Sequence, residues 1–474
     1  MADRIIKNVY TEYKSGPVVP AVIPTNIEFC AGTAKRGLLE HVYQVSDKAT
    51  AKELFGSGEL LKALEEKIDA SQGSAFLYVL RIAGASAAAA TANLMDATSG
   101  TAIPAIVLTA KEKGTWFNSD RVNVDVIADS NDRTIVITIG EQIYRFTGTT
   151  NAALVESING NSNFPVKAVV ATGSPTVVKA QTSVHLAGGD DGDTLANSDY
   201  TNAITLSETY TDAAWVHFIG ATTVALWTSI LTSCANMIAS NRGERFAILD
   251  FPTITAVDKL QPTAAEIVTY LASCKTLYDA VRDCNAVFCV GEGKFIASDG
   301  TVYTNRLTNT LTGLLAKIDI QKSLLGEKPV NLINLTTHFT NAQQTSLVTD
   351  GINYLRFQPG FGTIVALSQN RCPVGDTYNR VEKLRAVYTA GKKCRAAAFP
   401  HLGRPNDSQG HGIKLLETDM KKPLQIMQDA GQIDSYDLFI ECTPEMRDLG
   451  EARVVLTVNS MKAFEIILNE IYLQ

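Results

Sequence analysis

The chain has 474 residues, of which 45% are hydrophobic and 19% are charged, and its formal net charge is −7. This is the composition of a folded protein, and the length predicts about two to four domains. The negative charge argues against nucleic acid or an anionic membrane surface as a partner. No apolar run approaches the roughly 20 residues of a membrane span, and the first residues lack a signal-peptide core.

The first part of the chain predicts strands separated by a helix. Asn26–Ala31 is expected to be the first strand, and Ala75–Ile82 reads as a buried strand. Between them, leucines at helical spacing predict a single helix from about Lys48 to Ala70. Asp47 or Thr50 could cap that helix.

Residues 101–185 are predicted to form an inserted β domain. Helical periodicity disappears there, and apolar residues alternate with polar ones at Val122–Val126 and Ile135–Ile139. The turn residues Asp129–Asp132 separate the two runs, which is the pattern of a β-meander. The segment Gly188–Asp193 marks the return to the main body.

The region after the insert predicts an α/β layer. Arg245–Asp250 and Ala286–Val290 are predicted strands, and Thr263–Cys284 between them is a predicted amphipathic helix. A strand, a helix and a strand in close succession favour a parallel crossover. Residues 353–460 have mixed patterning and are expected to form a C-terminal α+β domain.

Both ends of the chain are extended in pattern and apolar. Arg453–Val458 and Phe464–Leu473 alternate in hydrophobicity, and Arg4–Tyr10 also reads as extended. Termini usually fray into polar disorder unless something ties them down, and a bare apolar edge strand invites pairing with another chain. We therefore expect the ends either to pair within the protein's own sheets or to be lent to neighbouring copies.

The eight cysteines are scattered and form no CxxC pair. Most lie in apolar contexts, so we expect reduced, buried thiols. A zinc site would need four ligands at tight spacing, which Cys284 and Cys289 do not provide.

No catalytic, cofactor or metal site is predicted. Gly291–Lys294 lacks the spacing of a phosphate loop, and Gly188–Asp193 lacks the ligand pattern of a calcium loop, so both are interpreted as turns. His411 has no serine on a sharp glycine-flanked turn to act with, and is expected to be an exposed loop histidine. Glu65 and Glu66 lie beside lysines in the predicted helix and are interpreted as a solvated face.

Five short segments follow one another in a distinctive order: Ala31–Gly37, Phe55–Gly58, Lys113–Asn118, Leu186–Gly192 and Asp350–Leu355. Together they resemble the motifs of the tail sheath proteins of contractile bacteriophages and related injection machines. The chain departs from that pattern at Leu38, where the family usually has proline, and at Phe117, where it has glycine.

The resemblance implies a multidomain α/β protein that is structural and not an enzyme. Its core would be subtilisin-like in fold but non-catalytic, with no cofactor. The implied domains are an N-terminal arm (1–25), a core in two stretches (26–100 and 186–352), an inserted β domain (101–185), a C-terminal α+β domain (353–460) and a C-terminal arm strand (461–474).

The resemblance also implies a function and partners. Sheath subunits stack as hexameric rings around a tail tube and contract to drive the tube through the target cell envelope. The implied partners are further copies of the chain, a tail tube protein, and baseplate and tail terminator proteins, without nucleic acid or membrane. The implied location is the contractile tail of a virion, after assembly in the host cytoplasm.

Subunits of this family join through their terminal arms, which complete a β-sheet in an adjacent subunit. The arm residues that this implies are Ile5, Ile6, Val9, Tyr10, Phe464, Ile466, Ile467, Leu468, Ile471, Tyr472 and Leu473. The inserted domain is expected on the outer side of the sheath. A helix near 415–430, with Lys414, Lys421 and Lys422, is a candidate tube-facing surface.

Two other classes remain open from the residues. Another self-assembling lattice protein, such as a surface-layer or capsid-like protein, would also polymerise through exchanged strands. A subtilisin-like hydrolase of related fold is the other, although no triad is visible in the sequence.

Overall fold

A computed structural model describes residues 25–97, 103–118, 121–129, 132–173, 176–240, 242–373, 375–404 and 410–463. Contacts divide these residues into two compact units, a larger one of Thr25–Leu384 and a smaller one that starts at Arg385 and ends at Lys462. In the described part, no helix is long and apolar enough to cross a membrane.

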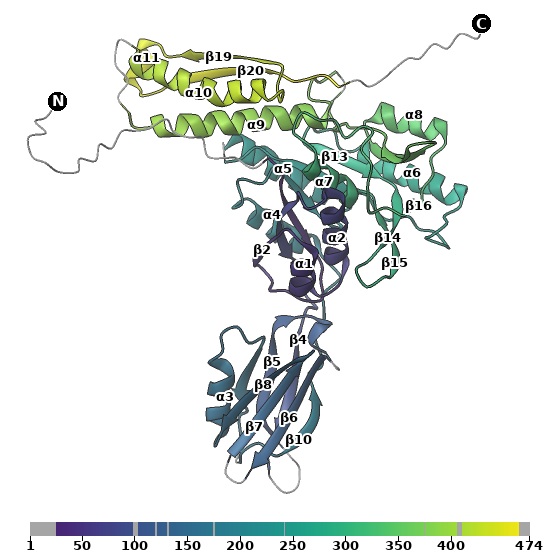
Figure 1. Ribbon diagram of the computed structural model, residues 1–474, viewed down its shortest axis with the longest axis vertical. Helices are drawn as coiled ribbons and strands as arrows, with labels where there is room; N and C mark the ends of the chain where they lie inside the picture. Colours follow the sequence, from purple (N-terminus) through teal and green to yellow (C-terminus); the bar gives the residue numbers. More distant parts are fainter. Residues whose placement is uncertain are drawn as a thin grey trace, which may run out of the picture. The chain divides into compact units, whose positions relative to one another are not determined.

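An eight-stranded sheet forms the centre of the larger unit (Figure 1). In spatial order its strands are β18 (Gly362–Val365), β17 (Asn353–Gln358), β13 (Ala286–Val290), β12 (Phe246–Asp250), β11 (Trp215–Phe218), β1 (Ile27–Gly32), β3 (Phe76–Arg81) and β2 (Val42–Val45). The six central strands are parallel, and β18 and β2 pair antiparallel at the two edges. The predicted parallel crossover between β12 and β13 is confirmed.

Outside the insert, the helices of the larger unit include α1 (Lys48–Phe55), α2 (Glu59–Ser71), α4 (Asn197–Ser207), α5 (Val224–Ala239), α6 (Ala264–Tyr278), α7 (Thr308–Lys317) and α8 (Asn341–Asp350). One face of the sheet forms an apolar core with α4, α5 and α6. There the ring of Trp227 contacts Phe251 and Phe288 edge-on, and its indole N–H donates to the carbonyl of Ala221 at 2.8 Å. Buried strands of this kind read as continuous apolar runs, which is why the sequence revealed them.

The predicted single helix at 48–70 is wrong, because the chain forms α1 and α2 with a break between them. Gly56 and Gly58 have φ angles of +69° and +117°, which a helix interior does not allow. Asp47 caps α1 as predicted, since its side chain accepts a hydrogen bond from the backbone N–H of Thr50 at 2.9 Å.

A small antiparallel sheet of β14 (Glu292–Ile296), β15 (Val302–Arg306) and β16 (Asn334–Leu335) follows the central strands. The interpretation of Gly291–Lys294 as a turn is therefore wrong beyond its first residue. Gly291 makes the turn with a φ angle of +106°, and β14 starts at the next residue.

Two further sheets are formed between the core elements β3 and α4. One contains β10 (Gln181–His185), β6 (Val122–Asp129), β7 (Asp132–Ile139) and β8 (Gln142–Gly148), and the other contains β4 (Ala89–Met95), β5 (Pro104–Lys113) and β9 (Val166–Val170). Their buried side chains share one core, to which Leu94, Ile106, Val124 and Ile137 contribute. Strand pairing in the insert starts at Ala89, earlier than the predicted domain start at residue 101, because β4 pairs with β5.

This region also contains a helix that the sequence pattern missed, α3 (Asn151–Asn159). The Thr150 side chain caps it by accepting from the N–H of Ala153 at 3.1 Å. Only Leu154 and Ile158 are buried on it. A single apolar pair at a spacing of four residues is too short a signal to distinguish from strand alternation.

The smaller unit contains most of α9 (Val381–Ala398), together with α10 (His411–Asp429), β19 (Ser435–Glu441), α11 (Pro444–Asp448) and β20 (Arg453–Asn459). β19 and β20 form a two-stranded antiparallel sheet, with Leu438 opposite Leu456. Leu438 is buried, as are Leu424 and Met427 of α10, so the helix covers one face of this sheet. The predicted strand at 453–458 is confirmed.

Candidate functional site

The eleven predicted arm residues, from Ile5 to Tyr10 and from Phe464 to Leu473, lie outside the described residues. The predicted arms therefore stay predictions. Three other features of the described chain bear on function: a buried polar face of the sheet, a joint between the sheet and the insert, and the two-stranded sheet of the smaller unit.

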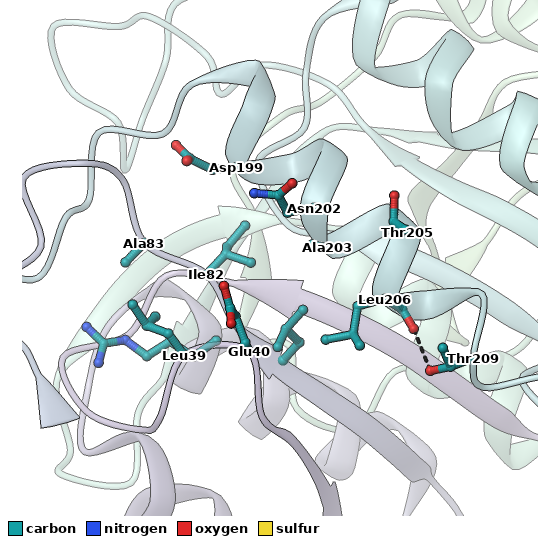
Figure 2. A pocket seen from close by; sticks show the side chains of 12 residues that line it. Leu39, Glu40, Ile82, Ala83, Asp199, Asn202, Ala203, Thr205, Leu206 and Thr209 are labelled. Atoms are coloured by element: carbon teal, nitrogen blue, oxygen red, sulfur yellow. Dashed lines mark hydrogen bonds between the residues drawn. The ribbon is translucent and has the colours of Figure 1, made fainter. Parts of the chain in front are cut away.

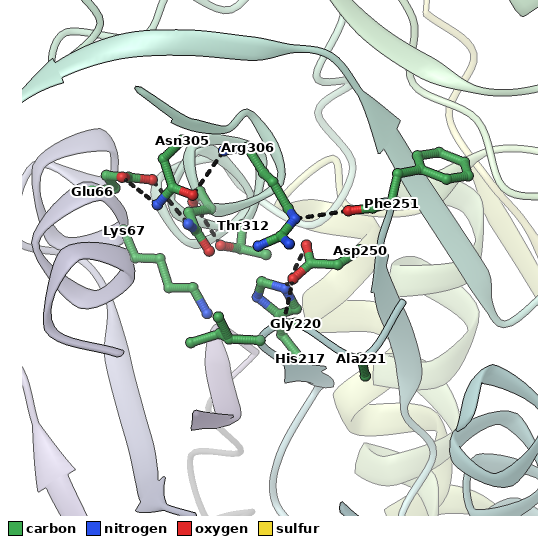
Figure 3. Close-up of polar contacts among 12 residues, drawn as sticks. Glu66, Lys67, His217, Gly220, Ala221, Asp250, Phe251, Asn305, Arg306 and Thr312 are labelled. Carbon is green, nitrogen blue, oxygen red and sulfur yellow. Dashed lines mark hydrogen bonds and ion pairs between the residues drawn. The ribbon is translucent and has the colours of Figure 1, made fainter. Parts of the chain in front are cut away.

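A row of ionisable side chains lies on the second face of the central sheet, between the sheet and the helices α2 and α7 (Figure 3). Lys67 of α2 forms an ion pair with Glu28 of β1. His217 of β11 lies 3.7 Å from Glu28, measured from Nδ1 to Oε1, and 3.1 Å from Asp250, measured from Nε2 to Oδ1. All four side chains are at most 2% exposed, so each depends on its neighbours for compensation.

Asp250 at the end of β12 is held ionised within this row. Burial alone would raise the pKa of its carboxyl group, but the neighbouring His217 and Arg306 and the N–H of Gly220 hold the pKa below its usual range. The Gly220 N–H donates to Oδ2 of Asp250 at 2.9 Å. For Lys67, burial would lower the pKa, but the pairing with Glu28 outweighs it and raises the pKa.

Glu66 of α2 lies beside this row, on the side facing α7, and has no cationic partner among the described residues. Its carboxylate accepts from the side-chain amides of Asn305 at 2.8 Å and Asn309 at 2.9 Å. Burial raises the pKa of Glu66 to about 8, well above its ordinary value. The interpretation of Glu65 and Glu66 as a solvated face is wrong, because they are 4% and 1% exposed.

One feature of the sequence indicates this buried polar layer. α7 begins Thr308-Asn-Thr-Leu-Thr-Gly313, a polar run without charges, and every residue of that run is buried. A closed layer of this kind gives no access to a substrate, so the His217 row is interpreted as an element of strand register. His411 is exposed as predicted but starts α10, so the interpretation as a loop residue is wrong.

A cavity of about 630 Å³ lies beside β3 and α4 (Figure 2). Its walls are mainly apolar, with Leu39, Ile82 and Leu206 among them. Two of its polar groups serve local structure, since Asp199 accepts from the N–H of Ala196 at 2.8 Å and Thr209 donates to the carbonyl of Leu206 at 2.8 Å. We assign no ligand to this cavity.

Four of the five sheath-like segments meet at a single joint between the central sheet and the insert. The Arg36 guanidinium stacks over the ring of Trp116 at 4.4 Å. A Cβ on Gly56 would lie 2.6 Å from the same ring, so only glycine allows this contact. The ring of Trp116 therefore packs against two other segments, 31–37 and 55–58.

The fourth segment, 186–192, closes the joint through hydrogen bonds. Asn118 and Gly189 exchange two of them, both at 2.9 Å. The Asp191 carboxylate accepts from the N–H of Thr115 at 2.6 Å and from its hydroxyl at 2.8 Å. Buried Arg81 at the end of β3 donates to the carbonyls of Gly37 at 2.8 Å and Asp191 at 3.3 Å. These hydrogen bonds therefore hold the two segments that connect the insert to the central sheet.

The two-stranded sheet of the smaller unit has unpaired edges. Neither β19 nor β20 pairs with a third strand in the described chain. On the face away from α10, Phe439 lies opposite Val455, and these side chains are 59% and 42% exposed. The outer edges of such a sheet carry backbone groups ready for further strands.

Solved structures resemble this chain over nearly its whole length, whereas neither a protein-family model nor a curated protein matches it. The sheath tail protein of Desulfitobacterium hafniense is 14% identical, with a TM-score of 0.65 over 96% of this chain and 100% of that one. The sheath tail protein of Listeria innocua is 16% identical, with a TM-score of 0.62 over 92% and 95%. The contracted helical sheath of the anti-feeding prophage is 12% identical, with a TM-score of 0.55 over 98% and 99%.

This chain has the tail sheath protein fold. The resemblance carried by the five segments is confirmed at that level, and so is a mixed α/β, multidomain architecture with several sheets. What the sequence did not indicate is that four of those segments, far apart along the chain, converge on one joint.

The buried Glu66 predicts a pH-dependent stability difference. Because its pKa is raised in the folded state, Glu66 contributes stability below the unfolded pKa of about 4.5, and this is lost as pH rises through about 8. In Glu66→Gln the amide stays neutral, and the side-chain oxygen Oδ1 of Asn309, which has no hydrogen-bond partner among the described residues, could accept from it. Between pH 5 and pH 9, calorimetry should show the free energy of unfolding of the variant rising relative to that of the wild type by on the order of 2–5 kcal/mol.

Glu53→Gln, on the exposed side of α1, is the matched control and should change little across that range. A Glu66→Gln protein whose stability tracks the wild type at both pH values would contradict the assignment of a raised pKa.

The joint predicts a specific effect of removing Asp191. Asp191→Ala leaves the N–H of Thr115 without its acceptor, which costs about 1–3 kcal/mol locally. Trypsin should therefore cleave faster at Lys113, next to the joint. Exposed Asp193→Ala, two residues away, should leave the cleavage rate unchanged. Equal rates in the two variants would show that Asp191 does not secure the joint.

Proposed function

We propose that this chain is the structural subunit of a contractile sheath, which polymerises as stacked hexameric rings around a tail tube. The observation that carries the proposal is the fold, because the likeness extends over at least 92% of this chain to two sheath tail proteins and a contracted sheath. A fold shared over one domain would support a function weakly, but here every part of the sheath subunit has a counterpart.

The two-stranded sheet of β19 and β20 supports a mechanism for linking subunits. We assign it as the acceptor of the terminal arms of neighbouring copies, which would extend it by β-augmentation. A strand of about ten residues reaches roughly 33 Å, and each new backbone hydrogen bond contributes about 0.5–1.5 kcal/mol net. The exposed Phe439 and Val455 lie on the face that added strands would continue.

Contraction in this proposal is a rigid-body rearrangement of subunits between two packings, with the extended form held kinetically. The arms stay paired while the bodies rotate. The joint at Trp116 and Asp191 supports this picture, because it would carry the insert along with the central sheet as one body. No nucleotide is needed for the stroke.

The proposed partners are the tail tube protein inside the sheath and baseplate and terminator proteins at its ends. Sheath assembly would take place in the host cytoplasm and end in a contractile tail, of a virion or of a related injection machine that drives its tube through an envelope. The insert is proposed to face outward, where side chains such as Ile143, 61% exposed, tolerate change.

The alternative lattice proteins differ from a sheath in the shape of their polymers. A surface-layer protein forms flat lattices and a capsid-like protein forms closed shells. The hydrolase alternative has little support, because the histidine–carboxylate row around His217 in the central sheet is closed to solvent.

Deleting residues 462–474 should leave a folded monomer that cannot polymerise. The deletion removes the C-terminal arm but no described element of either compact unit, so circular dichroism should be unchanged. Under conditions where the full chain forms hollow tubes in negative-stain electron microscopy, the truncated chain should form none and should sediment as a monomer.

Ile143→Asp on the exposed side of β8 serves as the control and should assemble normally. Tubes formed by the truncated chain would refute the arm model, whereas flat lattices or closed shells from the full chain would refute the sheath function itself.

A further inference from the structure

Cys284 and Cys372 are joined in a disulfide that bridges 88 residues of sequence. Cys284 lies between α6 and β13, and Cys372 lies between β18 and α9. The expectation that all eight cysteines are reduced is therefore wrong for this pair. Sequence spacing gave no signal of it, because the two residues meet only through the parallel pairing of β13 with β17.

The other six cysteines differ from this pair in their surroundings. Cys30, Cys234, Cys274, Cys289 and Cys394 are buried, and burial raises the thiol pKa of each, to about 12 for Cys30 and Cys234. Such thiols seldom ionise and are poor nucleophiles. Cys442 alone among the free cysteines is partly exposed. In the larger unit, thiol oxidation is therefore expected at Cys284 and Cys372.

The surroundings of the pair hold the two sulfurs together. The backbone N–H of Arg371, the residue immediately before Cys372, donates to the carbonyl of Ala286 at 2.8 Å, which fixes the two segments side by side. Two thiols held side by side in this way favour closure of an intramolecular disulfide once one of them has entered a mixed disulfide.

The bridged segment also fastens the ends of two helices. The Arg371 guanidinium donates to Oδ1 of Asp279 at 3.1 Å and to the carbonyl of Asp350, and it stacks over the ring of Tyr278 at 4.9 Å. These partners lie at the C-terminal ends of α6 and α8. Beyond this segment the chain enters α9, which continues into the smaller unit.

We propose that Cys284 and Cys372 form a reversible redox site that locks the segment leading into α9. In the forward step a thiolate of one cysteine attacks a low-molecular-weight disulfide such as glutathione disulfide, releasing one glutathione thiolate. The second cysteine, as its thiolate, attacks the mixed disulfide, forms the Cys284–Cys372 bond and releases the second glutathione. The protein dithiol is oxidised, the glutathione disulfide is reduced to two thiols, and reduced glutathione in excess reverses both steps.

Locking follows from the position of the bond. Crosslinking a long loop removes conformations from the unfolded chain and so stabilises the folded unit. Reduction leaves the segment held by hydrogen bonds and the Arg371 contacts alone. The state of this pair therefore sets how firmly the chain is anchored where it leaves the central sheet, whatever the function of the assembled protein.

The test uses the full chain, equilibrated with either reduced or oxidised glutathione and then alkylated after denaturation. Mass spectrometry of the oxidised sample should find a Cys284–Cys372 crosslinked peptide and six alkylated cysteines, against eight in the reduced sample. The oxidised protein should melt about 3 °C or more above the reduced one and should resist trypsin at Arg371.

Cys372→Ser should abolish the melting difference between the two conditions, and Cys442→Ser, the matched control, should retain it. The proposal is overturned by eight alkylated cysteines after oxidation, by a crosslink through Cys442, or by equal melting temperatures in the wild type. Stoichiometric zinc bound by the reduced wild type and lost in Cys372→Ser would also overturn it, since Asp376 lies within 4.8 Å of both sulfurs and the three would then be metal ligands.

Discussion

Backbone hydrogen bonding in a sheet of only two strands is the constraint on which this account depends. β19 and β20 satisfy each other's backbone N–H and C=O groups along one side only, and in the described chain no further strand pairs with their outer sides. A sheet edge of that kind either stays in water or pairs with another chain. The apolar terminal segments of the same sequence are predicted strands that lie outside the described residues. In the proposed function, neighbouring copies bring such a segment to this sheet edge, and a polymer would result.

The larger unit suits movement as one body in the proposed contraction. Its parallel sheet packs against an apolar core on one face and carries a row of buried ionisable side chains, Lys67, Glu28, His217 and Asp250, on the other. Such a row contributes little net stability, but it makes misplaced strand registers costly, because each would leave a buried ionisable group without its partner. The joint at Trp116 and Asp191 then ties the insert to that sheet. A body held together in this way suits the proposed rearrangement between two packings.

Much of the fold could be predicted from the sequence, because parallel strands such as Ala286–Val290 are continuous apolar runs and α6 has a clear amphipathic pattern. The misses have physical causes. Gly56 and Gly58 break a helix whose leucine spacing continues across them, and α3 is too short to show periodicity. Glu66 looked solvated because charge alone does not reveal burial when the compensating amides, Asn305 and Asn309, lie more than 200 residues away. The joint and the Cys284–Cys372 pair were missed for the same reason, since only tertiary structure brings their parts together.

Helical reconstruction of the assembled full chain by cryo-electron microscopy would locate the strands that pair with β19 and β20. We expect a hollow tube with six subunits in each ring, in which density for residues 5–10 and 464–473 of neighbouring copies extends the β19–β20 sheet. A tube in which that sheet remains two-stranded, or in which a subunit's own termini complete it, would refute strand exchange between copies.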